Sequence, residues 1–163
     1  QNCNIDGCVL VDKIIMRTEH IQHLVRTAET CVAEGSLQKA TRYFQRAFEL
    51  SMPGEFTAEL SLIRLSRLYH LQGDIITALD FIDRAIHLGP REPRYHLIRA
   101  ELLILQGNFD TALSAIYEAM TEPATHNTAL DLALEIAHAQ NDQQAVNALN
   151  ALIMKNCTSS PKH

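Results

Sequence analysis

The chain has 163 residues, with 14 Lys and Arg against 19 Asp and Glu, so its formal net charge is −5. This acidic balance argues against nucleic-acid binding, which needs a sustained basic surface, and no apolar run approaches the roughly 20 residues of a membrane span. With 47% hydrophobic residues but only 6 Gly and 5 Pro, the composition favours a soluble, all-helical chain with one continuous core.

Residues 1–17 precede the first regular pattern. The segment begins with Gln1 and carries two short apolar runs, Val9-Leu10-Val11 and Ile14-Ile15. We predict an N-terminal extension or a leading helix that covers the helices after it; a processed start and a piece of a longer protein stay open. The runs are too short for a signal peptide, which favours the cytoplasm, with a periplasmic or secreted location left open.

Four two-residue marks divide the rest of the chain at nearly regular intervals. Their first residues stand 38, 34 and 34 positions apart, and the marks are Gly35-Ser36, Gly73-Asp74, Gly107-Asn108 and Asn141-Asp142. A residue that adopts positive φ ends one helix, and a polar side chain directly after it caps the next. Each mark therefore predicts a turn between two antiparallel helices.

Aligned on these marks, residues 18–125 contain three repeats, over about 21–54, 59–92 and 93–126. Small residues recur at fixed offsets, and an alanine at a crossing lets two helices approach closely. The repeat-defining residues are Gly35, Ala40 and Ala47; Tyr69, Gly73, Ala78, Ala85 and Pro90; and Gly107, Ala112 and Ala119. The first interval is four residues longer, and we place this surplus in a loop at Ser51–Gly54, where Pro53 cannot continue a helix.

The last part of the chain departs from the pattern. Asn141 replaces the glycine, so we predict a degenerate capping helix pair over residues 126–155. The apolar face of its last helix, around Leu149 and Leu152, suits either a cap or the contact of a homodimer through terminal helices. Residues 156–163 are expected to form a flexible tail.

The repeating unit resembles the tetratricopeptide repeat, which has 34 residues and two antiparallel helices. The resemblance extends over roughly Ile21 to Lys155, and it is most complete in the second repeat at Leu62, Leu65, Ser66 and Tyr69 and the glycine and alanines after them. It implies an all-α fold, an antiparallel helix-pair solenoid forming a right-handed superhelix of about eight helices.

In this family the first helix of each repeat lines a concave groove. The resemblance places there Arg64, Arg67 and His70 of the second repeat, Arg94, Leu97 and Glu101 of the third, and Glu29 of the first. Because arginine forks bind carboxylates, we expect a partner-binding groove with a basic centre and an acidic wall toward the carboxyl terminus. Alternatively, Arg64 and Arg67 belong to a solvated face and pair with neighbours such as Glu59, Asp74 or Glu101.

The sequence contains no pattern typical of catalysis or metal binding. His20 and His23 share a helix face but lack a third ligand. The four scattered cysteines, Cys3, Cys8, Cys31 and Cys157, predict neither a disulfide framework nor a zinc site. A phosphate-binding glycine loop and a serine nucleophile elbow are both missing from the sequence. We therefore predict no enzyme activity, no cofactor and no metal.

Three functions are compatible with these features. The leading one is an adaptor, scaffold or assembly factor that binds a protein or peptide in its groove. The second is a small chaperone of bacterial secretion, because translocator chaperones have similar size and three such repeats. The third is a regulatory domain of a larger enzyme.

Overall fold

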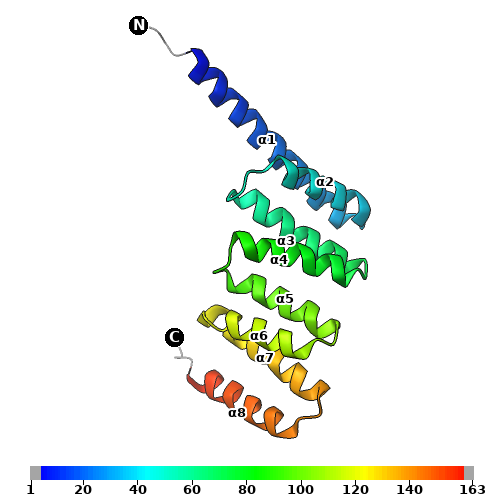
Figure 1. Ribbon diagram of the computed structural model, residues 1–163, viewed down its shortest axis with the longest axis vertical. Coiled ribbons are helices and arrows are strands. Elements are labelled where there is room, and N and C mark those ends of the chain that lie inside the picture. Colours follow the sequence, from blue (N-terminus) through cyan, green and yellow to red (C-terminus); the bar gives the residue numbers. More distant parts are fainter. Residues whose placement is uncertain (1–4, 160–163) are drawn as a thin grey trace. The chain divides into compact units, whose positions relative to one another are not determined.

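The computed structural model describes the backbone of residues 5–159 and the side chains of residues 9–156. Within this range the chain forms eight α-helices and no strand (Figure 1), which confirms the predicted all-α class and the number of helices. The helices are α1 (Ile5–Ala33), α2 (Leu37–Leu50), α3 (Phe56–Leu71), α4 (Ile75–Leu88), α5 (Pro93–Leu105), α6 (Phe109–Ala119), α7 (Pro123–Ala139) and α8 (Gln143–Ser159).

The helices belong to two compact units, which we describe one at a time. The first unit extends to Leu88 and holds α1 to α4; the second begins at Gly89 and holds α5 to α8. Consecutive helices pack against each other within each unit. The units are thus built from helix pairs, as the sequence predicts.

The four predicted turns share one geometry. The first residue of each mark has positive φ: 75° at Gly35, 82° at Gly73, 77° at Gly107 and 56° at Asn141. The amide of the next residue donates to a carbonyl five residues back, as from Asp74 at 2.9 Å. This bond closes a helix end whose last carbonyls would otherwise lack partners. The prediction of helix-ending turns at these marks is confirmed.

The capping role predicted for the second residue of each mark holds at two of the four positions. Asp74 and Asp142 each accept a hydrogen bond from the amide three residues later, at 3.1 and 3.0 Å. Ser36 and Asn108 make no such bond within the described chain, and Asn108 accepts the Thr111 hydroxyl instead, at 2.9 Å. Their ψ values of 63° and 72° differ from the extended backbone of a capping residue. The prediction is wrong at these two positions.

Helix α1 runs through the boundary that the sequence suggested at residue 17. No Gly or Pro occurs from residue 8 to residue 34, and Thr18 donates its hydroxyl to a carbonyl one turn back at 3.0 Å rather than capping a new helix. One helix of 29 residues results. At the other end α8 continues to Ser159, so the expected tail is helical at its start, and residues 160–163 lie outside the described residues.

The four surplus residues of the first interval are divided between a loop and a helix. The connection from Ser51 to Glu55 has five residues, against four between α4 and α5. Helix α3 has 16 residues and α5 has 13. The predicted loop therefore takes up one surplus residue, and the other three lengthen α3, because no helix-breaking residue follows Gly54.

Small residues mark the helix crossings of the first unit. Its alanines without exposed surface are Ala28, Ala40, Ala47, Ala78 and Ala85, and its largest fully buried side chains are Phe44, Leu62, Leu65 and Ile82. The hydroxyl of buried Ser66 donates to the carbonyl of Ala78 at 2.8 Å, which links α3 to α4. Close packing and one satisfied polar contact thus fix this helix pair.

The second unit uses the same small residues, with Ala112 and Ala119 fully buried on α6. Helix α7 packs against both α5 and α6, and the hydroxyl of its buried Thr125 donates to the carbonyl of Ala119. On α8, Val146 is buried whereas Leu152 is exposed. The end of this unit therefore keeps an uncovered apolar side chain on the helix predicted to be a cap.

Candidate interaction surfaces

The structure brings two predicted residues of the first unit into contact. Glu29 on α1 and Arg64 on α3 form an ion pair, with 2.9 Å between Oε1 and Nε. Both side chains are partly exposed, and the pair ties neighbouring first helices together. The pairing that the alternative interpretation expected for Arg64 is thus present, but with Glu29 as the partner.

This ion pair leaves a hydrogen-bond donor unused. The Arg64 Nε–H is buried and does not point at an acceptor among the described residues, although the carboxylate oxygen lies 2.9 Å from the nitrogen. A buried donor without an acceptor is destabilising. The nearest acceptor is the Glu29 carboxylate of the same ion pair, which a small rotation of the guanidinium would bring into line with this N–H.

Arg67 and His70 continue the same side of α3. Arg67 lies one helical turn after Arg64 and is exposed, and it has no ion pair within the described part of the chain. His70 follows in the last turn and is half-buried. We call the surface formed by Glu29, Arg64, Arg67 and His70 the α1–α3 face. Its uncompensated charge is the Arg67 guanidinium.

The predicted residues of the second unit differ in their exposure. Arg94 is exposed at the start of α5, where its Nε donates to Glu92 at 2.7 Å. This hydrogen bond lowers the pKa of the Glu92 carboxyl below its usual value. Leu97 is only 8% exposed and belongs to the core, whereas Glu101 is exposed. The proposed groove role of Leu97 is therefore not supported, because a buried side chain is not accessible to a partner.

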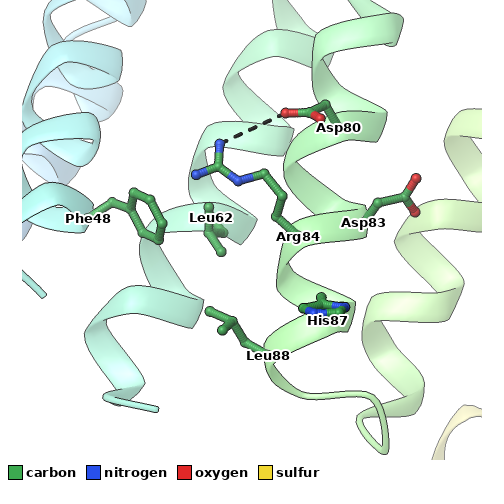
Figure 2. A pocket seen from close by; sticks show the side chains of 7 residues that line it. All are labelled: Phe48, Leu62, Asp80, Asp83, Arg84, His87 and Leu88. Carbon is green, nitrogen blue, oxygen red and sulfur yellow. Dashed lines mark ion pairs between the residues drawn. The ribbon is translucent and has the colours of Figure 1, made fainter. Parts of the chain in front are cut away.

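A pocket that the sequence did not reveal lies between α2, α3 and α4. Its volume is about 390 Å³, within the range of ligand-binding clefts. Figure 2 shows Phe48 of α2 and Leu62 of α3 on one side, facing the Arg84 side chain of α4. The remaining lining residues are Asp80, Asp83, His87 and Leu88. We call this site the α2–α4 pocket.

Arg84 is held in this pocket by two aromatic rings and one carboxylate. Its guanidinium carbon lies 4.9 Å from the centre of the Phe48 ring and 5.2 Å from that of Phe81. Its Nη1 is 3.9 Å from Asp80 Oδ2, which makes a long ion pair (Figure 2). The pocket thus combines an apolar wall with adjacent donor and acceptor groups, which suits an apolar side chain and the peptide group beside it.

Sequence reasoning missed this pocket because it searched the first helices of the repeats. Phe48 and Arg84 lie on second helices; the first repeat also has an arginine, Arg46, at the offset of Arg84, but the third has Glu118 there. A weak signal was present: an aromatic and a basic residue that the repeat alignment leaves unexplained. Their contact depends on the packing of α2 against its neighbours, which no local pattern records.

The described residues offer no sign of a metal centre or a membrane span. No group of three or more His, Cys, Asp or Glu side chains among them is placed to hold a metal ion. None of the helices between residues 5 and 159 combines the length and apolar character needed to cross a membrane. Cys31 is buried with a free thiol, and the side chains of Cys3, Cys8 and Cys157 lie outside the described residues.

Comparison with known proteins bears on the repeat and on the fold. A family model described as a tetratricopeptide repeat matches residues 93–116, which cover α5 and much of α6. No curated protein matches the chain in sequence.

Several solved structures share the fold. The type III secretion translocator chaperone SycD of Yersinia enterocolitica is 17% identical with a TM-score of 0.57, over 85% of this chain and 90% of that one. YrrB, a TPR protein with an unusual peptide-binding site, is 15% identical with a TM-score of 0.70, over 88% and 72%. PilW, a type IV pilus biogenesis factor, is 19% identical with a TM-score of 0.73, over 86% and 64%. Residues 93–116 are therefore a tetratricopeptide repeat, and the chain as a whole has the tetratricopeptide-repeat fold.

Proposed function

We propose that this chain is a protein-interaction module, an adaptor or assembly factor without catalytic activity, that binds a segment of a partner protein on the α1–α3 face. The observation that carries this proposal is the exposed, unpaired Arg67 beside the Glu29–Arg64 ion pair. An arginine without a carboxylate partner contributes little to the fold and is available to a ligand. The face joins residues from two successive repeats, as binding of an extended segment requires.

The chemistry of this face favours a partner segment with an acidic residue. Arg67 presents a planar fork that can take a carboxylate through two parallel hydrogen bonds. Arg64 is already paired with Glu29 and its Nε is buried, so Arg67 is the arginine of this face that a partner's carboxylate can reach. A segment with an exposed acidic side chain fits this group.

The proteins that share the fold lend support to this proposal. SycD has been solved with a peptide of the translocator YopD, and YrrB is described by its peptide-binding site. A secretion chaperone is the second candidate, because this chain aligns with 90% of the length of SycD. For that function we expect an otherwise unstable partner to stay soluble only when it is produced together with this chain.

The test selects binding peptides from a random phage-displayed library and measures their affinity for three proteins. We expect Arg67→Glu to weaken binding at least tenfold, since a charge-assisted hydrogen bond is worth about 1.5–3 kcal/mol. The control is Arg42→Glu, which makes the same change at an exposed position of α2. Equal affinity of the wild type and the Arg67→Glu variant would refute the assignment of this face.

A further inference from the structure

The first described turns of α1 carry a run of exposed apolar side chains. Leu10, Val11, Ile14 and Ile15 keep 60%, 54%, 48% and 48% of their surface exposed. Residues three and four positions apart lie on the same side of a helix, so these four form one continuous patch. Figure 1 shows this half of α1 extending beyond α2. We call residues 9–20 the arm and these four side chains the arm face.

The arm face continues the stripe that builds the core of the first unit. Apolar residues recur along α1 at alternating steps of four and three, and the buried members farther along are Ile21, Leu24, Ala28 and Cys31. Leu10 and Ile14 keep this spacing toward the amino end, with Arg17 between the two halves. Such spacing is typical of a helix seam that packs against another helix. The arm thus exposes a face that is suited to packing against a second helix, and no described helix covers this face.

A pocket lies at the base of the arm. It has a volume of about 240 Å³ and is lined by Thr18 and Ile21 of α1 and by Glu55, Phe56 and Thr57. Phe56 is 73% exposed. Because Thr18 follows Ile14 by one turn, the arm face leads directly into this pocket. An ion pair between Arg17 Nη2 and Glu55 Oε1, 2.6 Å apart, connects the base of the arm to the loop before α3.

We propose that the arm is a self-association surface, on which the arm of a second copy of this chain packs in antiparallel orientation. Helix α3 begins beside the base of the arm, so a parallel second arm would collide with it. An antiparallel arm instead brings its own Leu10 and Val11 to the pocket at Phe56. This inference goes beyond the proposed function, since it concerns none of the residues of the α1–α3 face.

The size and charge of the surface fit a second copy. The arm face and Phe56 expose on the order of 500 Å² per chain, so two copies approach the roughly 1,000 Å² of a specific but weak interface. The arm face contains no charged residue, so two acidic chains can meet there without like-charge repulsion. A lipid surface is a poorer fit, because Lys13 and Arg17 are the only Lys or Arg in the arm and Arg17 is already paired.

The experiment measures the molar mass of the full chain by light scattering over a wide range of concentrations. We expect the wild type to shift from the mass of one chain to that of two. Leu10→Glu combined with Ile14→Glu should raise the dissociation constant at least tenfold. Ile76→Glu, which changes an even more exposed apolar residue on α4, should leave it unchanged. Circular dichroism checks that each variant is folded.

Two further results decide how the second arm is oriented and whether a second chain or a lipid surface covers the arm. Phe56→Ala should weaken the dimer, and an unchanged dissociation constant would contradict antiparallel docking. The proposal would be overturned if the wild type stays monomeric. It would also be overturned if the combined Leu10→Glu and Ile14→Glu substitutions leave the dissociation constant of the dimer unchanged. A monomer that sediments with vesicles of phosphatidylglycerol and phosphatidylcholine would likewise overturn it and would assign the arm to lipid. The arm variant should still bind the peptides selected above, so this failure is distinguishable from failure of the proposed function.

Discussion

Overpacking a helix crossing with Ala85→Leu tests the assignment of alanines as crossing residues. Ala85 has no exposed surface on α4, and Leu65 of α3 and Ile82 of α4 are equally buried. The substitution adds three carbon atoms. If there were room for them, burial of about 0.8 kcal/mol per methylene would stabilise the fold by roughly 2 kcal/mol. In a packed crossing the added volume instead forces strain, and the free energy of unfolding falls by about 1–3 kcal/mol.

The sign of this change is measured by urea unfolding followed by circular dichroism. With a denaturant dependence of about 2 kcal/mol per molar urea, the midpoint should fall by roughly 0.5–1.5 M. The control is Ala148→Leu on α8, an exposed position where Ala and Leu have similar helix propensity. It should change the free energy of unfolding by less than about 0.5 kcal/mol. An unchanged or raised midpoint for Ala85→Leu would refute the claim that this crossing is closed.

Three other substitutions test the turns and the pocket. Gly73→Ala should destabilise by about 1 kcal/mol in a thermal melt through its φ of 82° alone, because a Cβ there meets no described atom within 4 Å; a larger loss would indicate a steric clash. Hydrogen bonds from Thr77 hold the pKa of Asp74 below its usual value, so their stabilisation is present above the ordinary carboxyl pKa and is lost as the pH falls through the lowered one. Asp74→Asn should therefore make stability less dependent on pH in acid, and an identical pH profile would contradict this role. Phe48→Ala should lower the melting temperature by removing the ring beneath Arg84, and a melt equal to the wild type would show that the contact is energetically neutral.

The fold was predictable because its main signals are local. A residue with positive φ ends a helix wherever it stands, and the marks at Gly73 and Gly107 specify turns without reference to the rest of the chain. The length of α1 was not predictable in the same way. A helix end is signalled by a residue such as Gly or Pro, and the apolar runs near Ile14 contain neither. Helix ends that no Gly, Pro or capping residue marks depend on helix propensity and tertiary packing together.

The candidate site was predictable only in part. The repeat pattern indicates which helix supplies a residue, and it assigned Glu29 and Arg64 to neighbouring first helices; that the two side chains pair is seen only in the structure. It does not give the rotation of that helix to within a residue, which is why Leu97 lies in the core instead of on a surface. The contact of Arg84 with Phe48 joins two helices of different repeats. Such a contact follows from tertiary packing, which a sequence pattern does not encode.

The continuity of α1 has a consequence for its own helix–coil equilibrium. An isolated helix as short as the arm is marginal in water, chiefly because its first turn is unfavourable to form. Here the part of α1 from Ile21 onward is held in the core and already helical. The arm can therefore form by adding helical residues to this part, without the unfavourable nucleation step. We expect turns that no other helix covers to melt reversibly from the amino end of α1, and a covering helix to stop that melting. Hydrogen exchange should therefore be fast in the amides of the arm, slow beyond Ile21, and slower in the arm once a second chain covers it.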